Sequence, residues 1–123
     1  MTRVTMLLAR GPDQPNGDVT DRLVLGLALT PQGQIDVDAY YAAPTPWLAF
    51  RTEGAGEKRP LEVIRIDDGW ALQSTNSEDD PIWVFDGHVF RPGELVSLRR
   101  PDSQILLYRI VATEAAPLHN GAG

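Results

Sequence analysis

The sequence contains no cysteine, a single lysine and no long hydrophobic run. Without cysteine the chain cannot form a disulfide, a thiolate zinc site, an iron–sulfur cluster or a thiol nucleophile. Its apolar runs are much shorter than the roughly 20 residues of a membrane-spanning helix, so we expect no membrane partner. The N-terminal segment carries one basic residue and too short an apolar stretch for a secretory signal, which predicts a cytoplasmic location.

Acidic side chains outnumber basic ones, 17 to 11, and give a formal net charge of -6. Nucleic-acid binding needs clustered Lys and Arg to neutralise phosphates, so this balance argues against a nucleic-acid partner. Only Lys58 is a lysine among the basic residues, a bias that indicates a GC-rich bacterial genome. The 123 residues fit one domain, which we place at 1–113, followed by a small, polar, Gly-rich tail at 114–123 that is expected to fray.

Short apolar segments alternate with turn residues along most of the chain. Period-two alternation and turn signals such as Asn16-Gly17 predict β-strands joined by tight reversals. About eight or nine strands are predicted, over residues 2–9, 22–30, 47–53, 61–66, 70–74, 82–85, 88–90, 94–99 and 103–112. Trp70 and Trp83 begin or lie inside these strands and are expected to fill the core. The spacing is typical of a β-sandwich or a barrel, and we predict an all-β antiparallel sandwich.

Residues 35–46 are compatible with two conformations. They can form a short helix that has Asp36 or Asp38 as its N-cap and ends at a proline, or they can form an irregular loop. Tyr40 and Tyr41 lie in this segment beside prolines. They indicate either a contact surface or packing against one end of the core.

The sequence carries no recognisable catalytic motif or phosphate loop. His119 lies in the predicted tail, and His88 follows a hairpin turn, where a surface position on a strand is expected. The acidic run Glu78-Asp79-Asp80 supplies oxygens for a cation, but a solvated turn explains it more simply. We therefore predict no metal, no cofactor and no enzymatic activity.

An enzymatic alternative is a small β-barrel hydrolase or sugar-binding enzyme that uses Asp36, Asp38 or Asp86. If Asp36 and Asp38 share one face of a strand, they lie about 7 Å apart. Glycosidases hold two carboxyl groups about 5 to 9.5 Å apart across a cleft. No other residue supports this site, so non-catalytic binding is the preferred interpretation.

Residues 68–111 contain a series of hairpin and turn motifs. In order, they are Asp68-Gly69-Trp70-Ala71-Leu72, Ser74-Thr75-Asn76, Ile82-Trp83-Val84-Phe85-Asp86-Gly87, Gly93-Glu94-Leu95-Val96-Ser97-Leu98 and Pro101-Asp102-Ser103-Gln104-Ile105-Leu106-Leu107. This segment covers about a third of the chain. In their order and spacing, its motifs resemble those of the forkhead-associated (FHA) domain, a β-sandwich that binds phosphothreonine peptides. The resemblance implies a sandwich scaffold and places Ser74, Thr75 and Asn76 at the family's phosphopeptide-binding loop.

The other phosphate-binding motifs of that family are incomplete in this sequence. No Gly-Arg pair occurs between Leu23 and Ile35, and the position of the family's Ser-x-x-His motif reads Thr45-Pro46-Trp47-Leu48. The threonine can replace the serine, but the fourth residue is not a histidine. The resemblance therefore implies a degenerate FHA-like scaffold, with Arg51 as a distant candidate for the missing charge.

The sequence predicts a non-catalytic protein-interaction or assembly module whose loops contact another protein or a peptide. The expected contact residues are Ser74, Thr75, Asn76, Arg51, Thr45 and Trp47. Two alternatives stay open: a phosphothreonine-peptide-binding FHA domain and a structural subunit of a larger assembly, such as a secretion or phage-like particle. Arginines around the Ser74 loop would favour phosphate binding, and an exposed apolar edge at residues 82–85 would favour assembly.

Overall fold

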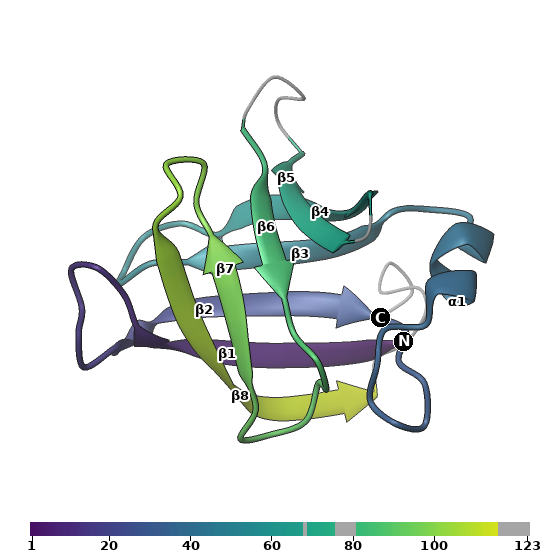
Figure 1. The fold of residues 1–123 in the computed structure, drawn as a ribbon, viewed down its shortest axis with the longest axis horizontal. Coiled ribbons are helices and arrows are strands. Elements are labelled where there is room, and N and C mark those ends of the chain that lie inside the picture. Colours follow the sequence, from purple (N-terminus) through teal and green to yellow (C-terminus); the bar gives the residue numbers. More distant parts are fainter. Residues whose placement is uncertain (68, 76–80, 116–123) are drawn as a thin grey trace.

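The chain folds into a closed antiparallel barrel whose eight strands follow one another in sequence order (Figure 1). This computed structural model describes residues 1–67, 69–75 and 81–115. The strands are β1 (Thr2–Arg10), β2 (Asp18–Leu27), β3 (Trp47–Thr52), β4 (Arg59–Ile66), β5 (Gly69–Ser74), β6 (Trp83–Asp86), β7 (Leu95–Arg99) and β8 (Ile105–Ala115). The prediction of an all-β antiparallel fold is confirmed, but the predicted sandwich is wrong, because β8 pairs with β1 and closes a single sheet.

The closure depends on irregularities in β1, which hydrogen-bonds to both β2 and β8. Its register with β2 shifts between Leu7 and Leu8, and its register with β8 shifts between Thr5 and Met6. Such bulges bend a strand and increase its twist, which brings the two ends of a sheet together. Period-two alternation is the same in sandwiches and barrels, so the sequence pattern alone does not distinguish them.

Seven predicted strands match the observed ones to within three residues at each end, and two differ more. The second strand begins earlier than predicted, at Asp18, because the Gly17 backbone is left-handed (φ 81°) and reverses the chain directly before it. Residues 88–90 form no strand. Instead, the Phe90 amide donates to the Gly33 carbonyl at 2.8 Å, and the Phe90 side chain is buried in the core.

Inward-facing side chains alternate with outward-facing ones along each strand and form one hydrophobic core. The largest fully buried side chains are Tyr108, Phe90, Met6, Leu23, Leu25, Leu27, Leu72, Leu98, Ile110, Val4, Val63 and Val96. Gly26 lies in the middle of β2, where a Cβ atom would come within 3.1 Å of the Leu48 carbonyl oxygen. Close approach of a neighbouring backbone therefore explains a glycine at this position inside a strand.

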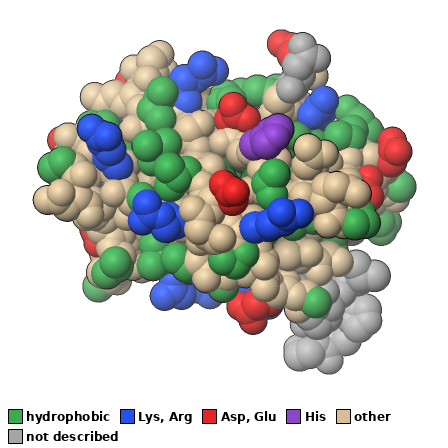
Figure 2. Space-filling model, turned by 60° about the horizontal axis from the view of Figure 1, so that its bottom comes forward, with side chains coloured by type: hydrophobic (Ala, Val, Ile, Leu, Met, Phe, Trp, Pro, Cys, Tyr) green, Lys and Arg blue, Asp and Glu red, His purple; other side chains and the backbone are tan. Residues whose placement is uncertain are grey.

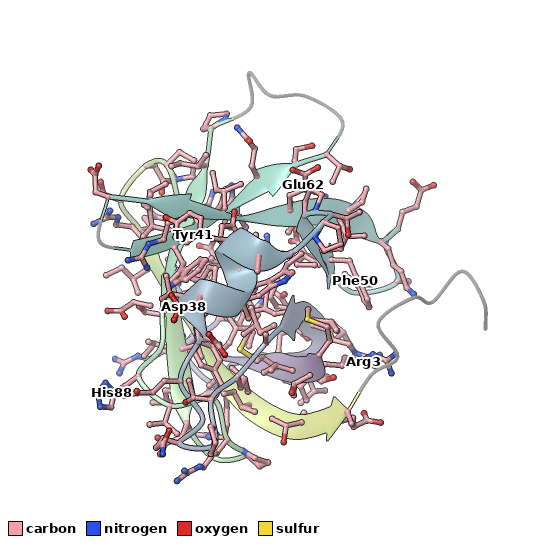
Figure 3. All side chains as sticks on the ribbon, turned by 90° about the vertical axis from the view of Figure 1, so that its right-hand side faces the viewer. Arg3, Asp38, Tyr41, Phe50, Glu62 and His88 are labelled. Atoms are coloured by element: carbon pink, nitrogen blue, oxygen red, sulfur yellow. The ribbon has the colours of Figure 1, made fainter. Side chains whose placement is uncertain are left out.

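The two ends of the barrel are built differently (Figure 1). The β1–β2, β3–β4 and β7–β8 connections lie at one end, which we call the loop end. The other end, which we call the helix end, carries helix α1 (Val37–Ala42), the start of β1 and the end of β8. Figure 3 looks onto the helix end and shows α1 across it, with Asp38 and Tyr41 labelled.

The sequence allowed either a short helix or an irregular loop for residues 35–46, and the structure has helix α1 there. Asp36 is its N-cap, and one carboxylate oxygen accepts a hydrogen bond from the Ala39 amide at 3.0 Å. The helix ends at Ala42, and its C-cap Ala43 has the extended backbone (ψ 132°) that is favoured before a proline. The two predicted roles of the tyrosine pair are divided: Tyr40 packs against the core, whereas the Tyr41 side chain is 68% exposed.

Tyr40, Trp47 and Trp70 pack together at the helix end, and we call them the aromatic cluster. Tyr40 meets Trp47 and Trp70 edge-on, at ring-centroid distances of 5.0 and 4.9 Å. The two indole rings stack at 6.1 Å, and the Tyr40 hydroxyl donates to the Val63 carbonyl at 3.1 Å. Edge-to-face and stacked contacts of this kind stabilise a core beyond the area that they bury.

Candidate functional site

Three polar side chains point into the barrel at its loop end. On β2 the inward positions run from Leu27 through Leu25 and Leu23 to Asp21, and on β3 they run from Trp47 through Ala49 to Arg51. Tyr108 of β8 points inward between Leu106 and Ile110. The sheet therefore places a carboxylate, a guanidinium and a phenol inside the barrel, with exposures of 5%, 9% and 0%. We call Asp21, Arg51 and Tyr108 the buried polar cluster.

Direct hydrogen bonds join the members of the buried polar cluster. Arg51 Nη2 donates to Asp21 Oδ2 at 2.9 Å, and Arg51 Nε lies 3.3 Å from Asp21 Oδ1. The Tyr108 hydroxyl donates to Asp21 Oδ1 at 2.9 Å and accepts from Arg51 Nε at 3.0 Å. This two-point contact fixes the plane of the guanidinium group, as expected for a bidentate arginine–carboxylate pair. Among the described residues, every buried side-chain nitrogen and oxygen has a hydrogen-bond partner.

The electrostatics of the cluster keep it in one protonation state. Burial would lower the pKa of Arg51, but its hydrogen bond with Asp21 and the nearby acidic groups outweigh burial and raise it. Burial raises the pKa of Tyr108 far above its usual range, and the charge of Asp21 adds to that effect. The phenol therefore keeps its proton and the guanidinium keeps its charge across the physiological range.

The other side of the Arg51 guanidinium faces outward. Its Nη1 atom lies 3.1 Å from Glu53 Oε1, and Nη1 of Arg59 lies 3.9 Å from the same oxygen. The Arg51 Cζ atom lies 5.0 Å from the centroid of the Trp83 ring, and that of Arg100 lies 5.8 Å from it. Arg51 thus connects a buried carboxylate to a partly exposed one.

A cavity of about 720 Å³ opens beside these groups at the loop end. Its apolar lining comes from strand residues that face inward and from prolines at the rim, and its charged lining comes mostly from the β3–β4 connection. The lining residues are Leu23, Arg51, Glu53, Gly56, Glu57, Lys58, Arg59, Pro60, Leu61, Leu72, Ser74, Pro81, Trp83 and Leu98. Ligand sites are typically mostly apolar cavities of about 300–1,000 Å³ with a few fixed polar groups, and this cavity fits that description.

The structure brings together some of the predicted contact residues and separates others. Arg51 and Ser74 line the same cavity, and the neighbouring Thr75 is exposed, its amide donating to the Pro60 carbonyl at 3.3 Å. Thr45 is exposed close to the helix end, and Trp47 is buried in the aromatic cluster there. Asn76 and the acidic run at 78–80, including the calcium alternative, lie outside the described residues.

Sequence analysis did not identify Asp21, Tyr108, Glu53 or Trp83 as parts of a site. A signal for two of them was present, because Asp21 and Tyr108 lie two residues from leucine or isoleucine side chains on the inward face of a strand. A polar side chain that continues an apolar period-two face has to be buried, and buried polar groups need partners. Recognising the partners required the long-range strand pairing.

The strand geometry of the hydrolase alternative is wrong. Asp36 caps α1 and Asp38 lies in its first turn, so the two residues do not share a strand face. Asp86 lines a separate cavity of about 390 Å³ at the helix end, beside His88, which is exposed but does not lie on a strand. Among the described residues, no group of three or more His, Asp or Glu side chains is placed to hold a metal ion.

Comparison with family models, curated proteins and solved structures finds no significant match. The resemblance of residues 68–111 to the FHA family therefore stays a prediction. No helix in the part of the chain that the structure describes is long and apolar enough to cross a membrane.

Proposed function

We propose that this chain is a non-catalytic binding module that takes a small amphipathic ligand into the loop-end cavity. The observation that carries the proposal is the position of the buried polar cluster, which opens through Arg51 onto a cavity with both apolar and charged lining. Eight-stranded barrels are just wide enough to hold one small ligand when side chains do not fill one end. At the helix end aromatic rings pack against one another, and the cavity of about 390 Å³ beside them is smaller than the cavity of about 720 Å³ at the loop end.

The groups inside the cavity favour binding over catalysis. Asp21 accepts hydrogen bonds from both Arg51 and Tyr108, so its oxygens are engaged. The raised pKa of Tyr108 keeps the phenol protonated, which makes it a poor base. These groups are suited to orienting a polar group of a ligand whose apolar part contacts the half-buried Leu61 and Trp83.

Tryptophan fluorescence offers a direct test of this site, because Trp83 lines the cavity whereas Trp47 and Trp70 lie at the other end. Titration with an amphipathic probe such as dodecanoate is expected to change the emission of the wild-type chain. Trp83→Phe should lose that change and still bind the probe in calorimetry. A change that persists in Trp83→Phe, or no binding by any amphipathic probe, would contradict the proposal.

A second candidate function is phosphothreonine-peptide binding, the activity that the FHA resemblance implies. One observation favours it: Ser74 shares its cavity with Arg51, Arg59 and Lys58, and converging cations suit a phosphate. Peptides with and without phosphothreonine should then differ in affinity, and Arg59→Gln should weaken only the phosphorylated form. Equal or absent binding of both peptide forms would exclude phosphothreonine recognition, and only the small-ligand proposal would remain.

The structural-subunit alternative depends on an exposed apolar edge. β6 pairs with β5 on one side and with β7 on the other, so it presents no edge. On the face shown in Figure 2, hydrophobic side chains lie in several groups between charged ones. If the chain assembles with copies of itself, sedimentation over a range of concentrations would detect the association.

A further inference from the structure

Two guanidinium groups at the mouth of the cavity converge on one carboxylate oxygen. Glu53 Oε1 lies 3.1 Å from Nη1 of Arg51 and 3.9 Å from Nη1 of Arg59. Glu53 follows the last residue of β3 and its side chain is 51% exposed, whereas that of Arg51 is only 11% exposed. A carboxylate thus already lies where the buried cation meets the cavity.

The two carboxylates that contact Arg51 have different roles. Asp21 is buried, holds the guanidinium in a two-point contact and also bonds to Tyr108, so it supplies the structural counter-charge. Glu53 reaches the opposite side of the guanidinium from a partly exposed position. Exposed ion pairs contribute little to stability, so another carboxylate can replace Glu53 at low cost.

We propose that the ligand carries an anionic group, and that Glu53 occupies the position of this group until the ligand binds. This inference rests on the proposed function and specifies its ligand class: an anionic amphiphile with an apolar chain or ring. Its anionic group displaces the Glu53 carboxylate from Arg51 and Arg59, and its apolar part contacts Leu61, Pro81 and Trp83, the apolar lining residues that keep accessible surface.

The chemistry of the cavity explains why an anion is preferred to a neutral or cationic group. A bound ligand covers the outward-facing Nη1 donor of Arg51, and a covered donor without an acceptor is costly, so a ligand that displaces Glu53 must supply an acceptor of its own. The charged lining consists of Arg51, Lys58, Arg59, Glu53 and Glu57. The cations in this lining already outnumber the acids by three to two, and by three to one once Glu53 turns away, which disfavours a further positive charge.

Three probes with the same twelve-carbon chain separate apolar binding from charge recognition: dodecanoate, dodecanol and dodecylammonium. Calorimetry on the full chain should show that dodecanoate binds roughly ten-fold more tightly than dodecanol, as expected for a charged hydrogen bond. Dodecylammonium should bind most weakly of the three. The ranking isolates the headgroup because the apolar contacts are shared.

Substitution of Glu53 tests its role as the displaced group. Glu53→Ala should raise the affinity for dodecanoate by about two- to five-fold, because the ligand no longer competes with an exposed ion pair. The matched control is Glu57→Ala, which removes an equal charge from the same lining and should change the affinity by less than about two-fold. Glu57 forms no ion pair within the described residues. Arg59→Gln should weaken dodecanoate and leave dodecanol unchanged.

Each outcome of these measurements supports or overturns the inference. Equal binding of dodecanoate and dodecanol, or equal effects of Glu53→Ala and Glu57→Ala, would overturn it while the proposed function stands. Absence of binding by all three compounds would overturn the proposed function and this inference together. The predicted ranking, combined with a gain specific to Glu53→Ala, would support both.

Discussion

The two ends of this barrel use the same strand alternation for opposite purposes. At the helix end, the inward positions hold Trp47 and Trp70, and Tyr40 from α1 covers them. At the loop end, the same strands and their neighbours place Arg51 and Asp21 inside, beside a cavity of about 720 Å³. One strand, β3, contributes to both ends within six residues.

The difference shows how a small barrel can place the residues that stabilise it at one end and the residues available for binding at the other. Packed aromatic rings stabilise the fold by removing apolar surface from water. A buried ion pair contributes little net stability, because desolvation of the two charges offsets their attraction. The loop end therefore retains charges that the fold does not need, and binding is the use for them that we propose.

The largest expected effect of a single change is at the helix end. Trp47→Ala should lower the free energy of unfolding by about 3–5 kcal/mol, because a large buried ring is replaced by a cavity. Urea unfolding followed by circular dichroism measures this change. If the two ends are as separate as the structure indicates, the folded fraction should bind dodecanoate with unchanged affinity.

Removing the charge at the loop end should cost nearly as much for a different reason. Arg51→Leu leaves Asp21 buried beside Tyr108 without its cation, and we expect a loss of about 3 kcal/mol. The combined variant Asp21→Leu, Arg51→Met and Tyr108→Phe should regain most of the stability, because no polar group is left unpaired. A combined variant that is less stable than Arg51→Leu would show that the cluster stabilises the fold.

Tyr108 should contribute less to the free energy of unfolding than Arg51 does, and its contribution should depend on pH. Tyr108→Phe removes one acceptor and one donor from the cluster, which should cost about 1–2 kcal/mol near neutral pH. Because the pKa of Tyr108 is raised in the folded state, its contribution is complete below the ordinary tyrosine pKa of about 10. Above that pH the unfolded chain loses the proton first, so stability should fall as pH rises.

Unfolding measured at intervals from about pH 9 to about pH 11 tests this dependence. Wild-type stability should decrease over that window more steeply than the stability of Tyr108→Phe. Parallel curves for the two proteins would mean that Tyr108 does not carry the alkaline dependence.

The smallest effect should come from the cap of α1. Asp36→Ala removes the acceptor for the Ala39 amide and should lower the free energy of unfolding by about 1 kcal/mol. Asp38→Ala is the matched control, since Asp38 lies in the first turn but is not the cap. Equal losses in the two variants would contradict the capping role of Asp36.

Most strand segments were predictable because their signals are local. Period-two alternation and turn residues identify the β4–β5 hairpin and its two strands from the sequence alone. Closure was not predictable in this way, since it depends on bulges in β1 and on pairing between residues such as Val4 and Thr113 at opposite ends of the chain. The helical conformation of the segment after β2 became definite only with its packing against Trp47 and Trp70.

The candidate site was predictable only in part. Arg51 and Ser74 were singled out through the FHA resemblance, and the structure places both in one cavity. Asp21 was not singled out, because its contacts with Arg51 and Tyr108 span 30 and 87 residues of sequence. Such contacts depend on the order of strands around the barrel, which no local pattern specifies.

The central claim, that the loop end binds the ligand and the helix end does not, has one direct measurement. Backbone amide NMR signals of the isotope-labelled chain should be recorded during titration with dodecanoate. Shifts are expected at Arg51, Ser74 and Trp83, whereas the signals of Tyr40 and Trp47 should stay unchanged. Shifts centred on α1 and the aromatic cluster, or no shifts at saturating probe, would contradict it.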